Sequence, residues 1–147
     1  MPLYRQVMKK KRLDIEYSYD FELIGVISSA KGYKLAWDLN RQLGVRLVKQ
    51  KDVGIQFNNG ITGTFAHFSY ESAVNVLRLF RNKANEAEAA RNFLVQEYPH
   101  LDFVVLSQGA DKWGSGQLQE HLRGISSVEM VASIPLGTVK SKDYFIF

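Results

Sequence analysis

Apolar and polar residues alternate without interruption along residues 13–23. This period of two predicts a β-strand with one buried face. The next apolar residues, Ile24, Val26 and Ile27, are no longer separated by polar ones. We therefore expect the strand to continue into the middle of a sheet that is covered on both sides.

The first helix is predicted to follow Ser28 and Ser29 and to be closed by Gly44. Its buried side is expected to hold Tyr33, Ala36, Trp37, Leu39, Asn40 and Leu43. Ser28 and Ser29 are predicted to cap its start with their hydroxyls. Gly44 is predicted to end it, because helix ends favour a left-handed residue.

The middle of the chain is rich in β-prone residues. Residues 45–57 predict a weaker strand region that is interrupted at Lys51 and Asp52, and residues 58–60 predict a turn. Residues 64–70 and 74–80 are two β-prone runs with a short connection, which predicts a hairpin.

The second half of the chain predicts a further series of elements. Residues 85–98, rich in Ala and Glu, predict a helix with Asn85 as its cap. A strand is predicted at 102–107, a short helix at 117–123 and a strand at 128–134. Residues 144–147 are expected to add an edge strand or to dock their aromatic rings on the core.

Two strand-to-helix passages separated by a hairpin predict an α+β fold. We expect a two-layer sandwich, mainly an antiparallel sheet with helices on one face, that is broadly ferredoxin-like. A length of 147 residues fits one domain. The predicted organisation is a basic, flexible N-terminus at residues 1–12 followed by a single domain at residues 13–147.

The positive charge is concentrated near the N-terminus. Residues 1–51 hold 11 Lys and Arg against 5 Asp and Glu, although the net charge of the chain is only +4. Lys9, Lys10, Lys11 and Arg12 are candidate nucleic-acid contacts, because cations placed near phosphates release counterions. The alternative, which we favour, is a solvated terminus whose charges keep the protein in solution.

Several classes of protein are not expected from the composition. The chain has no cysteine, so disulfides and thiolate metal sites are excluded. His67, His100 and His121 lie in three separate segments, so we expect no metal site, and no motif predicts a cofactor. The apolar runs are too short for a transmembrane helix, and the N-terminus lacks the apolar core of a signal peptide. We therefore expect a cytoplasmic protein with no membrane association.

Four segments of the chain have a distinctive sequence: Asp14-Ile15-Glu16-Tyr17, Asp20-Phe21-Glu22-Leu23-Ile24-Gly25, Tyr33-Lys34-Leu35-Ala36-Trp37-Asp38-Leu39-Asn40 and Phe68-Ser69-Tyr70-Glu71. Through these segments the chain resembles the bacterial IPExxxVDY family. The motif of the family name corresponds to residues 95–103, where Glu97 and Asp102 keep its acidic positions and Gln96 replaces its proline. The resemblance implies a cytoplasmic bacterial protein from a family without an assigned activity.

Two groups of residues are candidates for chemistry. Gly109, Gly114, Ser115 and Gly116 lie between a predicted strand and a predicted helix, where backbone N–H groups can bind an anion. A plain connecting loop is favoured, because Ser115 stands where a phosphate loop has its lysine. Glu97 and Asp102 are the second group, either as an acid–base pair or, as we favour, as residues that stabilise a turn.

The leading functional prediction is a non-enzymatic protein-interaction or self-association domain. It rests on 2 Trp, 7 Tyr and 9 Phe, which are difficult to bury in a small chain without a partner. The expected partner is another protein or a second copy of this chain. Nucleic-acid binding through the N-terminus is one alternative. A small-ligand-binding protein or enzyme with a pocket near residues 109–116 is the other.

Overall fold

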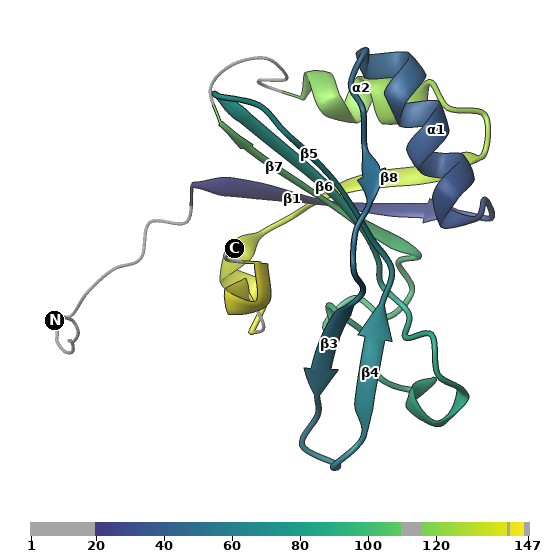
Figure 1. Ribbon diagram of the computed structural model, residues 1–147, viewed down its shortest axis with the longest axis vertical. Coiled ribbons are helices and arrows are strands. Elements are labelled where there is room, and N and C mark those ends of the chain that lie inside the picture. The colour runs from purple at the N-terminus through teal and green to yellow at the C-terminus, as the bar shows by residue number, and fades with distance from the viewer. Residues whose placement is uncertain (1–19, 110–115, 141, 146–147) are drawn as a thin grey trace, which may run out of the picture.

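The computed structural model describes residues 20–109, 116–140 and 142–145. Figure 1 shows a sheet with two helices on one side and a two-stranded arm that extends away from it. The helices and strands follow in the order β1 (Phe21–Ser28), α1 (Gly32–Leu43), β2 (Val48–Lys49), β3 (Val53–Gln56), β4 (Thr62–Phe65), β5 (His67–Glu71), β6 (Asn75–Arg81), β7 (Phe103–Gly109), α2 (Gln117–Arg123) and β8 (Val128–Ile134).

The main sheet has six strands in the order β2-β5-β6-β7-β1-β8, and neighbouring strands are antiparallel. The predicted α+β class is therefore confirmed. As expected from Ile24 and Val26, β1 lies inside the sheet, between β7 and β8. The ferredoxin-like detail stays a prediction, since β2 and β5 extend the sheet beyond β6.

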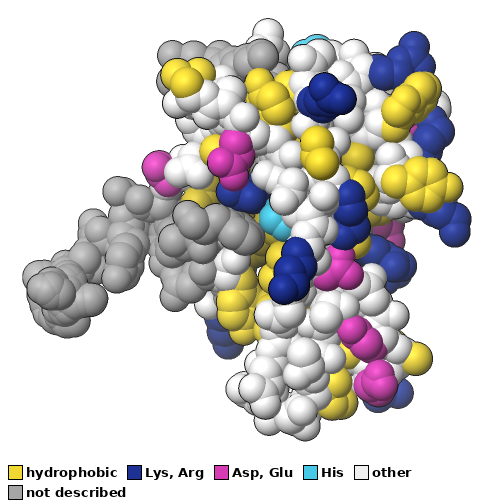
Figure 2. All heavy atoms as spheres, viewed as in Figure 1, with side chains coloured by type: hydrophobic (Ala, Val, Ile, Leu, Met, Phe, Trp, Pro, Cys, Tyr) yellow, Lys and Arg dark blue, Asp and Glu magenta, His cyan; other side chains and the backbone are white. Residues whose placement is uncertain are grey.

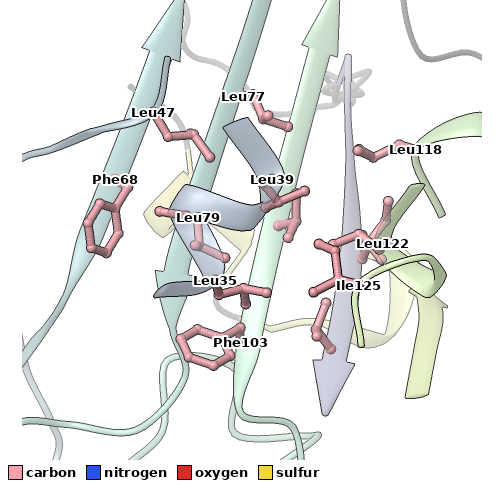
Figure 3. Close-up of a cluster of buried hydrophobic side chains, with 14 of the residues drawn as sticks. Leu35, Leu39, Leu47, Phe68, Leu77, Leu79, Phe103, Leu118, Leu122 and Ile125 are labelled. Carbon is pink, nitrogen blue, oxygen red and sulfur yellow. The ribbon is translucent and has the colours of Figure 1, made fainter. Parts of the chain in front are cut away.

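Each face of the sheet has its own hydrophobic core. On one face, α1 and α2 pack Leu35, Leu39 and Leu122 against strand residues such as Leu79 of β6, as seen in Figure 3. The other face is covered by the β3–β4 arm, by residues 84–101 and by the 3-10 turn Lys142–Phe145. The strand β7 is consequently buried on both sides, so the apolar run in 102–107 reflects its position in the sheet.

The arm continues the pairing of β2 with β5 beyond the edge of the main sheet. Gln50 N–H donates to the carbonyl of His67, and β3 then pairs with β4. The predicted interruption at Lys51 and Asp52 and the predicted turn at residues 58–60 are both present. The arm therefore brings Phe57 and Phe65 onto the second core.

The prediction of a helix at residues 85–98 is wrong. That segment holds only a 3-10 turn at Ala87–Ala89. Its backbone is fixed instead by Asn82, whose Nδ2 donates to the carbonyls of Tyr98 and Leu101 and whose Oδ1 accepts the N–H of Val95. These long-range bonds replace the local bonds of a helix.

The ends and faces of the predicted helices also need correction. The N-cap of α1 is Lys31, with no side-chain hydrogen bond, so neither Ser28 nor Ser29 caps it. Gly44 ends α1 in the left-handed region as predicted, with φ of 66°. Tyr33 and Trp37 are exposed by 68% and 50%, contrary to their predicted burial.

The C-terminal segment docks rather than forming a strand. Phe145 is buried, and its ring lies 5.3 Å from that of Phe80 and 6.5 Å from that of Phe21. Of the two predicted outcomes, an edge strand or docking of the aromatic rings, docking is the one observed at Phe145. Residues 13–19 of the first predicted strand lie outside the described residues.

Candidate functional site

A pocket of about 660 Å³ opens where β1, β2 and β6 end and where β5 and β7 begin. The antiparallel pairing brings these strand ends together at the first turn of α1. The residues that line the pocket are Ser29, Ala30, Lys31, Gly32, Tyr33, Lys49, Ala66, Phe68, Arg81, Asn85 and Phe103. Its size is within the range of small-molecule sites.

The base of the pocket is aromatic. Phe68 and Phe103 are 8% and 3% exposed, and Figure 3 places both rings at the same end of the helix-side core. A Cβ atom at Gly32 would lie 3.3 Å from the ring of Phe68 and 3.7 Å from that of Phe103. Glycine at this position therefore lets the start of α1 lie directly against the two rings.

The rim of the pocket is cationic. Lys31, Lys49 and Arg81 line it, and none of the lining residues is acidic. Lys49 Nζ lies 2.6 Å from Asp52 Oδ1, so part of its charge is compensated. Among the ion pairs of the described residues, none involves Lys31 or Arg81. These two side chains supply the uncompensated positive charge of the site.

The start of α1 adds to this electropositive character. The N–H groups of the first helical turn have no acceptor within the helix, and the helix dipole is positive at this end. The carbonyl of Lys31 accepts the first helical bonds, from Lys34 and Leu35. The preceding donors, those of Gly32 and Tyr33, thus lie at the pocket that both residues line.

The pocket is bordered by exposed aromatic residues on α1. Tyr33 lines the pocket, and Trp37 follows one helical turn later. Lys34 Nζ and Arg41 Cζ lie 4.6 Å and 4.8 Å from the centroid of the Trp37 ring. These cation–π contacts explain how a large aromatic side chain stays at the surface of a helix.

The two acidic candidates, Asp102 and Glu97, bind different backbone segments. Asp102 Oδ2 accepts the N–H of Ser28, and its Oδ1 lies 3.6 Å from Lys83 Nζ. Glu97 Oε2 accepts the N–H of Lys140. Each carboxylate thus accepts a hydrogen bond from a different backbone segment, and the role of the two residues stays a prediction.

The glycine-rich loop is described only at its two ends. Gly109 and Gly116 have φ of 115° and 83°, and a Cβ atom at Gly109 would overlap the carbonyl oxygen of Val74. Gly114 and Ser115 lie outside the described residues, as do Lys9, Lys10, Lys11 and Arg12 of the predicted nucleic-acid contact. The anion-binding role of the loop and the nucleic-acid role of the basic N-terminal residues therefore stay predictions.

One histidine has a strongly altered environment. His67 is buried and stacks on Phe80, with ring centroids 4.6 Å apart. Burial, and then the positive charges of Arg78 and Lys49, lower its pKa from 6.5 to about 4. It lies on the sheet face opposite the pocket. Within residues 20–109, 116–140 and 142–145, no three acidic or histidine side chains form a group that could hold a metal ion.

A carboxylate next to the pocket also titrates unusually. Glu86 follows Asn85, and its two oxygens accept the hydroxyl and the N–H of Thr64, which lowers the pKa of the carboxyl group. Asn85 Nδ2 donates to Asp52 Oδ2 and Thr64 Oγ1. This network holds the segment after β6 against the arm, at the side of the pocket.

The sequence alone does not predict the pocket. It identifies Phe68 and Phe103 only as strand residues, and Lys31, Lys49 and Arg81 are far apart along the chain. Positive residues at the ends of predicted strands were a usable signal. They could be combined into one site only once the strand order was known.

A scan against protein-family models finds no match to the chain. Searches of curated proteins and of solved structures find no significant match either. The resemblance to the IPExxxVDY family therefore stays a prediction. In the part of the chain that the structure describes, neither helix is long and apolar enough to cross a membrane.

Proposed function

We propose that this chain is a binding domain for a small anionic ligand with an apolar body, held in the pocket at the start of α1. The observation that carries the proposal is the combination of Lys31, Lys49 and Arg81 on a rim without carboxylates, above Phe68 and Phe103. An apolar group of the ligand would lie on the rings, and its anionic group would meet the cations and the helix start.

An extended nucleic acid fits this surface less well. Nucleic-acid domains usually have positive charge over one continuous face. Here Lys34 pairs with Asp38 and Lys83 with Asp102, and Figure 2 shows acidic side chains among the basic ones. A localised anion is therefore favoured. Bacterial origin and a cytoplasmic location stay predictions from the sequence.

The proposal is tested with 1-naphthyl phosphate, which joins a planar apolar body to an anionic group. We expect it to bind, with NMR shifts at residues 29–33 and at Arg81. Neutral 1-naphthol and inorganic phosphate should each bind at least about tenfold more weakly, because each satisfies only half of the site. Absence of binding by 1-naphthyl phosphate, or equal binding by 1-naphthol, would overturn the proposal.

A pair of variants tests the role of the rim. Arg81→Gln should weaken binding by about fivefold to tenfold, the effect of losing one charge-assisted hydrogen bond in a half-open site. Arg123→Gln removes a cation of α2 that pairs with Glu120 and should leave affinity unchanged. Equal weakening by both variants would indicate general electrostatics. Steeply salt-dependent binding of oligouridylate without competition by 1-naphthyl phosphate would replace the proposal with the nucleic-acid alternative.

A further inference from the structure

We propose that the outward face of α1 docks on the surface of an anionic lipid bilayer. This face consists of Tyr33, Lys34, Trp37 and Arg41, and we call it the α1 ridge. The α1 ridge borders the pocket but shares only Tyr33 with its lining. The inference therefore goes beyond the proposed ligand and does not depend on it.

The helical period separates the two sides of α1. Leu35, Ala36 and Leu39 are buried in the helix-side core. With 3.6 residues per turn, the four residues of the α1 ridge fall within an arc of about 100° on the opposite side of the helix. Asp38, the only acidic residue of α1, lies outside this arc and pairs with Lys34. The α1 ridge therefore presents two aromatic rings and two cations, and no carboxylate.

The aromatic rings of the α1 ridge face solvent. Tyr33 and Trp37 have the two most exposed aromatic rings among the described Phe, Tyr and Trp residues, at 68% and 50%. Figure 2 shows hydrophobic and basic side chains next to one another where Figure 1 places α1. Tyr and Trp combine an apolar ring with a polar tip, and they are enriched where membranes meet water. The composition of the α1 ridge thus matches the headgroup layer of a bilayer.

The charge of the α1 ridge complements an anionic surface. Among the ion pairs of described residues, none involves Arg41 or Lys31, which precedes the helix. Both side chains are exposed. Cations that lie close to anionic headgroups are attracted by the negative surface potential. The long stems of Lys34 and Arg41 also let their charges stay at the headgroups while Trp37 enters deeper.

The size and shape of the α1 ridge favour a bilayer over an acidic protein. The exposed parts of Tyr33 and Trp37 amount to roughly 250 Å². A stable protein complex buries about 800 Å² on each partner. A fluid headgroup layer needs no matching groove and accepts side chains that project from a convex helix. The protein interaction and self-association expected from the aromatic content stay predictions.

Surface docking is compatible with the short apolar runs of the sequence. Those runs led to the expectation of no membrane association, but their length bears only on helices that cross the hydrocarbon core. A helix that lies on the surface needs cations and a few apolar or aromatic side chains on one face. Here the apolar side of α1 stays in the protein core, and only the α1 ridge meets the lipid.

The test is co-sedimentation of the full chain with phosphatidylcholine vesicles that contain about one third phosphatidylglycerol. We expect binding at low salt that weakens at least about tenfold when the salt is raised from about 0.05 M to about 0.5 M. Pure phosphatidylcholine vesicles should bind far less. Trp37→Gln should weaken binding by about tenfold, and Arg41→Gln by about fivefold, the effect of one cation at an anionic surface. Absence of binding to the anionic vesicles overturns the proposal.

Matched variants locate the contact. Met130→Gln removes an apolar side chain of β8 that is 45% exposed, and Arg123→Gln removes a cation of α2, so neither should change the binding. Equal weakening by the α1 variants and these controls overturns docking through the α1 ridge. Displacement from vesicles by excess 1-naphthyl phosphate would assign the contact to the pocket and would also overturn it. Circular dichroism spectra that match the unmodified chain establish that the variants are folded.

A soluble polyanion separates the bilayer from an acidic macromolecule. Polyglutamate should bind more weakly than the anionic vesicles, because it offers charge but no apolar layer for Trp37. Tight binding of polyglutamate that Trp37→Gln weakens, without binding to vesicles, would replace the bilayer with an acidic protein partner.

Discussion

Acidification charges a histidine that the fold keeps neutral. His67 is 5% exposed, and the desolvation of its ring is the largest cause of the lowering of its pKa to about 4. Arg78 of β6 and Lys49 of β2 act in the same direction. The carboxylate of Asp52 and a hydrogen bond with the backbone of Lys51 oppose them without reversing the effect.

The sign of the pH dependence follows from this lowered pKa. Between pH 6.5, the ordinary value for histidine, and pH about 4, the unfolded chain binds the proton and the folded chain does not. The free energy of unfolding must fall as the pH decreases through this window, by about 1.4 kcal/mol for each pH unit. The total contribution of His67 is a loss of about 3 kcal/mol, and none of it occurs above pH 7.

The assay is urea unfolding of the unmodified chain and of the His67→Gln variant, at pH values from 7 to 4. Glutamine is polar and does not titrate. The difference between the free energies of unfolding of the two proteins at each pH therefore cancels the contribution of the other titratable groups. We expect the unmodified chain to lose about 3 kcal/mol relative to the variant across this range. A difference that stays constant, or an imidazole pKa near 6.5 in an NMR titration, would refute the reasoning.

Three other changes test how the fold is held together, each by urea unfolding. Asn82→Ala should cost about 3 kcal/mol, because it leaves the buried Val95 N–H and Leu101 carbonyl without their partner; a cost below about 1 kcal/mol would contradict this. Gly109→Ala should cost about 2 kcal/mol through its positive φ and the overlap with Val74, whereas an unchanged midpoint would show that the turn adapts. Phe145→Ala should cost about 3 kcal/mol by opening a cavity in the second core, and a neutral result would show that the C-terminal turn is not docked in solution.

The elements that were predicted correctly are those with a strong local pattern. The strand at residues 128–134 has the predicted bounds, and the helix at 117–123 also does. Gly44 marked the end of α1 by its conformational freedom alone. Local periodicity was sufficient in these cases because the neighbours of each residue in sequence are also its neighbours in the element.

The errors arise where distant contacts decide the structure. Residues 85–98 have a helical composition, but Asn82 and the second core hold them in an irregular path. The helical period predicts that Trp37 lies on the buried side of α1, whereas Lys34 and Arg41 cover its ring at the surface. Neither effect leaves a periodic trace in the sequence.

The candidate pocket depends on the same kind of information. Arg81 is opposite Phe103 in the β6–β7 register, although 21 positions separate them in the chain. The register brings the cation to the rim above an aromatic residue. Sequence reasoning could identify both as strand residues but could not place them in one site.

The dependence of residues 84–101 on Asn82 has a consequence for the native-state dynamics of the protein. A segment with so little regular structure can detach as a cooperative unit while the antiparallel sheet and both helices persist. Its amide protons should then exchange with solvent earlier than those of β1 and β7. Each such local unfolding event would expose the apolar side of β7 to solvent and create a short-lived species prone to aggregation.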